Sequence, residues 1–139
     1  MGDSVGPEAR FESLPEPEAM ALLRTHEVGR VAWETAQGPV ILPVAYAWQD
    51  GVVGFRTADR GTLATLAQPT EVAFQIDDYD VGTATGWSVL MTATTSRETV
   101  PGAVARWHEL LPAPWAPGDR DWVIVLTPDS VSGRIVARA

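Results

Sequence analysis

The chain has 139 residues, which suits one domain with its own core, and 18 acidic against 10 basic residues give a net charge of −8. An acidic surface repels phosphate backbones, so binding to nucleic acid or to an anionic membrane is disfavoured. The sequence has no cysteine, which excludes disulfides, thiolate nucleophiles and zinc–thiolate sites, and no lysine, which excludes Schiff-base chemistry.

The N-terminal part begins with a polar stretch. Residues 1–12 are expected to be flexible, and residues 13–139 are expected to form a single domain. The chain shows neither the apolar segment of a signal peptide nor a run of membrane-spanning length, so we expect a cytoplasmic protein. Ser13 and Glu16 have the spacing of a capping box, and the apolar residues after them recur with helical spacing. This pattern predicts a helix over residues 14–26.

A section with the alternation of β-strands follows. Asp50 and Gly51 give a strong signal for a tight turn between two strands. Pro43 interrupts one of these strands, and because proline cannot donate a sheet hydrogen bond it marks an edge, a bulge or a functional break. The predicted strands cover residues 28–35, 40–48, 52–57, 71–77, 86–97, 122–127 and 130–137.

Two further short helices are predicted between the strands. Asp59 can cap one over residues 60–67, and a third helix runs from Thr99 and Pro101 to about Leu111. Seven strands with hairpin-length connections favour an antiparallel barrel, because three short helices are too few to cover a parallel sheet. The predicted fold class is therefore mainly β (α+β).

Most catalytic constellations are absent from the sequence. His26 and His108 each stand alone and are interpreted as hydrogen-bonded or surface side chains. Ser88 does not lie in a GxSxG elbow, and no glycine-rich dinucleotide motif follows a predicted strand. The residue types therefore leave the catalytic residues unassigned and predict no metal site.

One junction between predicted elements suits a phosphate group. Arg56 and Thr57 end a strand, and Arg60, Gly61 and Thr62 fall in the first turn of the short helix that follows. A helix N-terminus offers unpaired N–H groups and a partial positive charge, and nearby arginines add charge-assisted hydrogen bonds. On the residues alone, surface arginines beside an ordinary helix cap remain the alternative.

Several segments match a known family in order and spacing. They are a leading helix, VGRVA at 28–32, PVAYAW at 43–48, DGVVGFRT at 50–57, the short helix, VAFQID at 72–77, GWSVLM at 86–91, LPAPW at 111–115 and PDSVSGRIV at 128–136. Taken together, from about Leu14 to Arg138, the chain resembles the pyridoxamine 5′-phosphate oxidase-like family of split-barrel flavin-binding proteins. The resemblance implies an antiparallel split β-barrel of six to seven strands with three short helices. It also implies a homodimer with cofactor sites at the subunit interface.

The resemblance further implies which residues hold the cofactor, expected to be flavin mononucleotide (FMN) or alternatively a deazaflavin. Residues 56–62 would hold its phosphate, two backbone segments would lie along its ring, and two residues of the other subunit would close the site. The implied residues are Pro43, Val44, Ala45, Tyr46, Arg56, Thr57, Arg60, Gly61, Thr62, Trp87, Ser88 and Val89, with Trp115 and Arg134 from the other subunit. Many relatives carry a lysine where this chain has Thr62. Arg60 could compensate; otherwise flavin affinity would be low or another cofactor preferred.

Three functions stay open on this basis. The first is a flavin- or deazaflavin-dependent oxidoreductase on a small organic substrate, in which the cofactor supplies the hydride chemistry. A true pyridoxamine phosphate oxidase is disfavoured, because a second phosphate site would need more arginines. The alternatives are a module that carries or senses flavin, deazaflavin or haem without turnover, and a dimeric scaffold without a cofactor.

Overall fold

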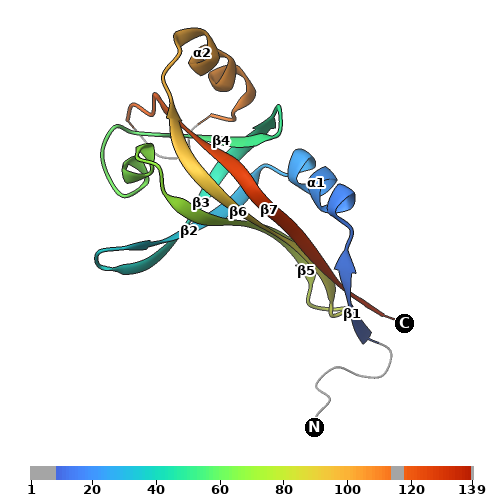
Figure 1. Cartoon of the computed structure of the whole chain (residues 1–139). Helices are drawn as coiled ribbons and strands as arrows, with labels where there is room; N and C mark the ends of the chain where they lie inside the picture. The colour runs from blue at the N-terminus through green and yellow to red at the C-terminus, as the bar shows by residue number, and fades with distance from the viewer. Residues whose placement is uncertain (1–8, 114–117, 139) are drawn as a thin grey trace.

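The computed structural model describes residues 9–113 and 118–138 of the chain. This part forms a β-barrel with helices on its outside (Figure 1). The strands are β1 Ala9–Leu14, β2 Val28–Thr35, β3 Gly38–Gln49, β4 Val52–Thr57, β5 Glu71–Asp80, β6 Thr85–Glu98 and β7 Trp122–Arg138. The helices are α1 Glu16–Thr25, the 3₁₀ helix η1 Leu63–Ala67, and α2 Pro101–Leu110.

Six of the strands close into a ring. Every pairing is antiparallel, the strands follow the order β7-β4-β3-β2-β5-β6, and β6 pairs with β7 to complete the circle. β1 stands outside this ring and pairs with the C-terminal half of β7. The predicted antiparallel split barrel of six to seven strands is confirmed. The described part has two α-helices and one 3₁₀ helix instead of the three helices expected.

The core follows from the alternation of side chains along each strand. Val31 and Trp33 of β2 and Met91 of β6 point into the barrel and are buried. α1 buries Ala19 and Leu23 against the same core. α2 lies at the end of the molecule away from both termini (Figure 1) and covers a second cluster, formed by Trp107, Leu111 and Val123.

The structure corrects the prediction for the N-terminal part. Residues 9–14 form strand β1, where a flexible segment and the start of a helix were predicted. β1 pairs along its whole length with β7, so a long-range contact decides its conformation. α1 begins at Glu16 after Pro15, with no side-chain cap, so the capping box predicted from Ser13 is not formed. Residues 1–8 lie outside the described residues.

β7 is a single strand of 17 residues where two strands were predicted. Pro128 lies opposite Ala93 and Ser130 opposite Thr92, so Asp129 is an extra residue in β7. Such a bulge kinks a strand without ending it. The break predicted between residues 127 and 130 is therefore an irregularity inside one strand, which borders β1, β4 and β6.

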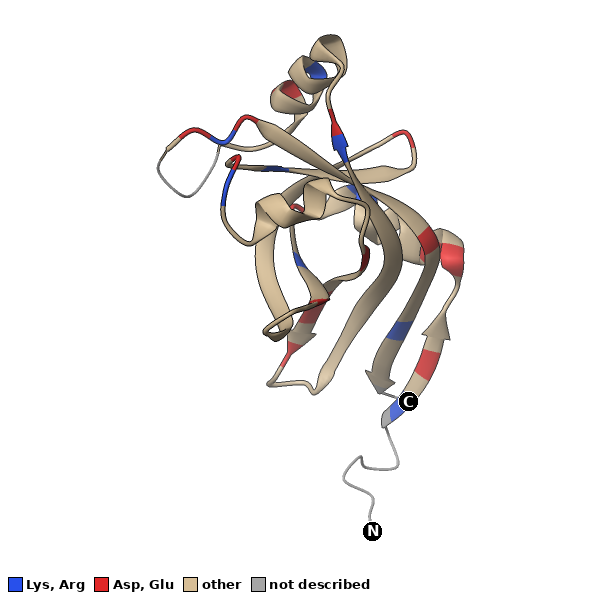
Figure 2. Ribbon diagram, turned by 60° about the vertical axis from the view of Figure 1, so that its left-hand side comes forward, with Lys and Arg blue, Asp and Glu red and all other residues tan. Residues whose placement is uncertain are grey.

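In the described part of the chain, neither α-helix has the length and apolar character that crossing a membrane requires. Figure 2 shows that charged residues lie on strands and helices as well as in loops.

Candidate cofactor-binding site

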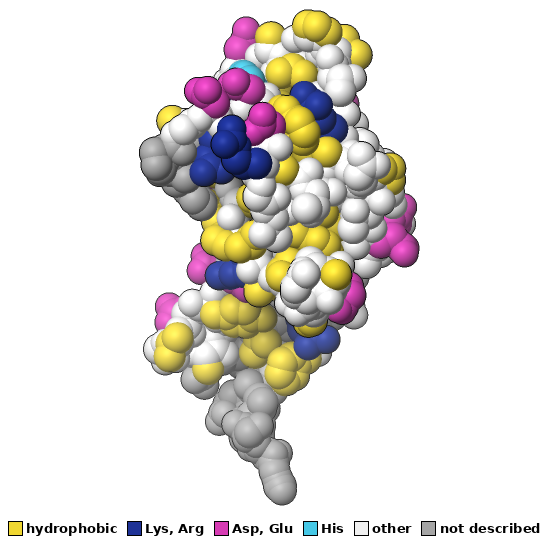
Figure 3. Space-filling model, turned by 90° about the vertical axis from the view of Figure 1, so that its left-hand side faces the viewer, with side chains coloured by type: hydrophobic (Ala, Val, Ile, Leu, Met, Phe, Trp, Pro, Cys, Tyr) yellow, Lys and Arg dark blue, Asp and Glu magenta, His cyan; other side chains and the backbone are white. Residues whose placement is uncertain are grey.

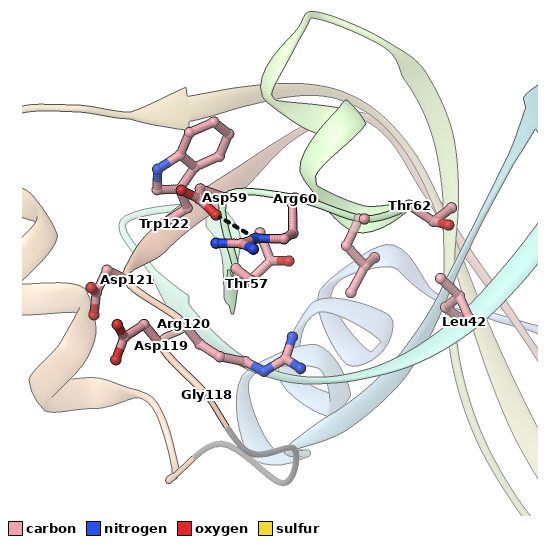
Figure 4. A pocket seen from close by; sticks show the side chains of 13 residues that line it. Leu42, Thr57, Asp59, Arg60, Thr62, Gly118, Asp119, Arg120, Asp121 and Trp122 are labelled. Carbon is pink, nitrogen blue, oxygen red and sulfur yellow. Dashed lines mark hydrogen bonds and ion pairs between the residues drawn. The ribbon is translucent and has the colours of Figure 1, made fainter.

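A cavity of about 760 Å³ opens where β4 ends (Figure 4). It lies between the segment that joins β4 to η1 and the segment that leads into β7, with one residue of β3 at its edge. Its described lining residues are Leu42, Thr57, Ala58, Asp59, Arg60, Gly61, Thr62, Leu63, Gly118, Asp119, Arg120, Asp121 and Trp122. The junction that the sequence singled out for phosphate therefore lines a real cavity.

The local structure at this junction differs from the prediction. η1 begins only at Leu63 and is a 3₁₀ helix, Thr62 precedes it, and no side chain caps it. Gly61 has a φ of 94°, a conformation that interrupts a helix and that glycine adopts without strain. The predicted helix from residue 60 with Asp59 as its cap is therefore wrong. The helix N-terminus argument does not apply to this segment, and any anion must be held by side chains and by the bent backbone.

The charges at the cavity are mixed. Arg60 is paired with Asp59 through a contact of 3.2 Å from Nε to Oδ1, and both side chains are largely exposed. Asp119 and Asp121 add two more carboxylates to the lining. The face in Figure 3 likewise shows basic side chains beside acidic ones rather than a uniformly basic patch. Attraction for an anion must therefore come from the placement of individual groups and not from the net charge.

Arg120 is the basic lining residue that the sequence analysis did not predict. Its Nε atom is buried and has no hydrogen-bond partner among the described residues, and no carboxylate there forms an ion pair with it. The main-chain carbonyl of Arg120 accepts a 2.9 Å hydrogen bond from Nε of Arg56, which is 64 residues earlier in the chain. Only the pairing of β4 with β7 brings these residues together. A lone arginine in a proline- and glycine-rich loop gave no signal of this.

Arg56 itself does not line the cavity. It is half-buried on β4, and its hydrogen bond holds the segment from Gly118 to Trp122. The ring of His108 adds a second attachment, a 3.1 Å contact between Nε2 and the carbonyl oxygen of Asp121. Two side chains from neighbouring elements thus fix this wall of the cavity.

Both histidines have structural contacts, as the sequence interpretation expects. Besides the contact of His108, Nδ1 of His26 lies 2.9 Å from the carbonyl oxygen of Leu22. The ring of His26 also meets Trp87 edge to face, with 4.8 Å between the ring centres. Neither histidine lies among the described lining of the cavity.

The segment of β3 expected along a flavin ring starts at the edge of the cavity. Leu42 lines the cavity, and Pro43 follows it with an exposed side chain. Val44 and Tyr46 point into the core instead, and Ala45 is half-buried. Only the backbone and the side chains of Pro43 and Ala45 are therefore open to a ligand in this segment. Burial raises the pKa of Tyr46 above its ordinary value.

The remaining predicted residues form a second group on β6 and β7. Ser88 is paired with Arg134, Val89 is buried in the core, and Trp87 is half-buried. Around the ring, β6 is separated from β3 by β2 and β5 on one side and by β4 and β7 on the other, whereas β7 is separated from β3 by β4. At the usual strand spacing, the three steps along the sheet from β3 to β6 amount to about 14 Å. The structure brings Thr57, Arg60, Gly61 and Thr62 together at the cavity and leaves the group on β6 and β7 outside its described lining. Trp115 lies outside the described residues.

Comparisons with known proteins agree with this architecture. Residues 15–135 match the family model described as pyridoxamine 5′-phosphate oxidase. The chain is 36% identical over 130 residues to the uncharacterized protein Rv0080 of Mycobacterium tuberculosis, covering 89% of this chain and 85% of that protein. The FAD binding protein from Mycobacterium smegmatis has a similar structure, with a TM-score of 0.77 and 26% identity over 92% of this chain and 99% of that one. A FAD-binding protein from Mesorhizobium loti shares the fold, with a TM-score of 0.73 and 19% identity over 93% of this chain and 98% of that one. This chain therefore belongs to the pyridoxamine 5′-phosphate oxidase family.

Proposed function

We propose that this chain binds a flavin at the cavity beside residues 57–62 and acts as an oxidoreductase on a small organic substrate. The observation that carries the proposal is the cavity itself, which is bordered by the segment that the family resemblance assigns to the cofactor phosphate. The similarity to the Mycobacterium smegmatis protein, which is named for FAD binding, supports a flavin in general. FMN is our first candidate, and FAD and a deazaflavin are the forms to compare with it.

The residues at the cavity fit such a cofactor. Arg120 has a buried donor without a partner in the described part of the chain, which suits a phosphate oxygen. Thr62 adds an exposed hydroxyl, and no atom lies within 4 Å of where a side chain on Gly61 would be, so the backbone there is open. Leu42 and Pro43 give the cavity an apolar edge, against which the planar flavin ring could lie. The bound flavin would supply hydride transfer, and the chain would bind and orient it.

A carrier that exchanges its flavin is the second candidate. Three carboxylates line the described part of the cavity, and Thr62 stands where many relatives carry a lysine. Both features weaken the hold on an anionic cofactor, because each carboxylate repels it and the threonine contributes no charge. Weak and reversible binding suits a flavin that is carried, sensed or used as a substrate.

We also propose a homodimer formed through the outer face of the sheet β3-β2-β5-β6. One row across this face joins Ile41, Ala32, Ala73 and Thr92, and the row beside it reaches Leu90. Ile41 is 58% exposed and Leu90 is 44% exposed, so this face presents apolar area to solvent. A two-fold pair could bring the β6–β7 group of one copy near the cavity of the other, which would explain why one chain separates the two groups.

The test begins with the purified protein. We expect visible flavin absorption, or saturable binding of FMN in a titration, and mass spectrometry should identify any small molecule released on denaturation. Bleaching of the bound flavin by a nicotinamide donor supports the oxidoreductase, whereas tight or exchangeable binding without reduction supports the carrier. A colourless protein that binds none of FMN, FAD, riboflavin or a deazaflavin would overturn the proposal.

A further inference from the structure

We infer that Arg120 supplies the guanidinium that binds the anionic phosphate of the ligand, and that Arg56 is a positioning residue that acts through it. This assignment rests on the proposed flavin site and specifies its anion-binding group. It differs from the expectation drawn from the family resemblance, in which Arg56 and Arg60 contact the phosphate directly. Four observations support it.

The first observation concerns Arg60. Its side chain is 87% exposed, and its Nε atom is 3.2 Å from the carboxylate of Asp59. An anion at Arg60 would have to compete with this neighbouring carboxylate and with water. Arg60 is therefore poorly placed to hold a phosphate, although it lies in the segment that follows the end of β4.

The second observation concerns Arg120. Its Nε atom is buried, and no described residue accepts a hydrogen bond from it. Buried charged donors are normally satisfied, because losing water without gaining a partner is unfavourable. Figure 4 shows the Arg120 side chain reaching from its loop toward the side of the cavity where Leu42 and Thr62 lie. An anion in the cavity would provide the missing acceptor.

The third observation is how the loop is held. The carbonyl of Arg120 accepts the 2.9 Å hydrogen bond from Arg56, and the carbonyl of Asp121 is 3.1 Å from the ring of His108. Trp122 begins β7 and is paired with Thr57, a residue of the same cavity. These contacts fix the backbone of Arg120 relative to the strand end. Arg56 is not among the described lining residues, and its side chain meets the cavity wall at the carbonyl of Arg120, so we expect its effect on a ligand to pass through Arg120.

The fourth observation is the residue type. A guanidinium presents donors in a planar fork that matches two phosphate oxygens, and it stays charged when it is partly buried. Thr62 provides no cation at the position where many relatives have a lysine. Among the described lining residues, Arg120 is the cation that no carboxylate neutralises.

The experiment compares FMN with riboflavin, which differ only in the phosphate. Dissociation constants are measured for the wild type, Arg120→Ala, Arg120→Lys, Arg56→Ala and Arg60→Ala. Arg106→Ala is the control, because it removes the same charge from an exposed position on α2. We expect Arg120→Ala to weaken FMN binding roughly 10- to 100-fold, the size of a lost charge-assisted hydrogen bond, and to leave riboflavin binding nearly unchanged. The FMN affinity of Arg120→Lys should fall between those of the wild type and Arg120→Ala.

The role of Arg56 is tested by a double-mutant cycle. Arg56→Ala should also lower FMN affinity selectively, and the double variant Arg56→Ala/Arg120→Ala should bind FMN no more weakly than Arg120→Ala alone. A purely structural role for Arg56 would instead weaken FMN and riboflavin together and would add to the loss from Arg120.

The outcomes separate the two proposals. If the wild type binds FMN and Arg60→Ala, rather than Arg120→Ala, abolishes the preference for FMN over riboflavin, the assignment of Arg120 is wrong and the flavin site stands. The assignment of Arg120 is also wrong, with the flavin site still standing, if Arg120→Ala weakens the binding of FMN and of riboflavin equally. If the wild type binds no flavin at all, the proposed function fails, and the assignment fails with it.

Discussion

The hydroxyl of Tyr46 donates a 2.7 Å hydrogen bond to the main-chain carbonyl of Leu23, in the last turn of α1. The last four carbonyls of a helix have no partner within the helix, so a side chain from β3 completes the end of α1. Tyr46 is almost fully buried, and its ring meets Phe74 edge to face at 5.0 Å between centres. One residue therefore joins the helix to the core of the barrel.

Replacing Tyr46 with phenylalanine should destabilise the protein. The substitution keeps the ring but leaves the Leu23 carbonyl without its donor, so we expect the free energy of unfolding to fall by about 1–2 kcal/mol. Urea denaturation measures the change. Tyr79→Phe is the control, because Tyr79 is 49% exposed, and that variant should keep nearly wild-type stability. Equal stabilities for the two variants would contradict this role for Tyr46.

The stability should also fall at alkaline pH. Burial raises the pKa of Tyr46, so at pH values above about 10 the unfolded chain loses this proton while the folded chain keeps it. Unfolding then releases a proton, and the free energy of unfolding decreases as the pH rises. The chain has no lysine or cysteine, so few other side chains titrate in this range. Denaturation curves from about pH 9 to about pH 11 should show this decline, and Tyr46→Phe should remove most of it. If Tyr46→Phe lost stability in the same way, the decline would come from another titrating group.

Replacing Gly54 with alanine should disturb the contact between β4 and α2. A Cβ atom at Gly54 would lie 2.6 Å from Cζ3 of Trp107, which is much closer than atoms tolerate, so the helix would have to shift. Overpacking of this kind costs about 1–3 kcal/mol. Thermal denaturation gives the loss, and near-ultraviolet circular dichroism should report the changed environment of Trp107.

Gly102→Ala is the matched control for this variant. Gly102 lies in α2, and no atom is within 4 Å of its added Cβ. Alanine is the better helix former by about 0.5–1 kcal/mol, so this variant should be slightly more stable than the wild type. Gly54→Ala with unchanged stability would mean that Trp107 is not held against β4 in solution.

The proposed dimer face can be tested with a single charge. Leu90→Arg places a guanidinium on the proposed outer face in place of an exposed leucine, so it should convert a dimer into monomers in analytical ultracentrifugation. Leu110→Arg is the control on α2, where Leu110 is 49% exposed. A wild type that is monomeric, or a Leu90→Arg variant that stays dimeric, would exclude this face as the interface.

The strands could be predicted from the sequence where local signals determine their bounds. Residues 28–35 and 52–57 have the predicted bounds, because alternation and flanking turns define them in the sequence. β1 could not be predicted in this way, since the sequence ARFESL lacks a clear alternation and its strand is completed by pairing with β7. The break predicted in β7 was wrong for a related reason: β7 continues past Pro128 with a bulge against β6, and no local signal reveals that neighbour.

The candidate site was predictable only in part. The strand end at Arg56 and Thr57 pointed to an anion site, and the structure has a cavity there. The sequence could not show that Arg56 would hold a loop or that Asp59 would pair with Arg60, because both depend on side-chain geometry. Arg120 was missed because it reaches the cavity only after the barrel closes.

The position of β7 in the sequence affects how the barrel can form during synthesis. It is the last strand in the sequence, yet it provides partners for β1, β4 and β6. Until residues 122–138 leave the ribosome, β4 and β6 each keep an unpaired edge and β1 has nothing to join. Such edges are prone to pair with other chains. This barrel therefore cannot close progressively during synthesis, and a nascent chain that stalls before β7 would need protection from aggregation.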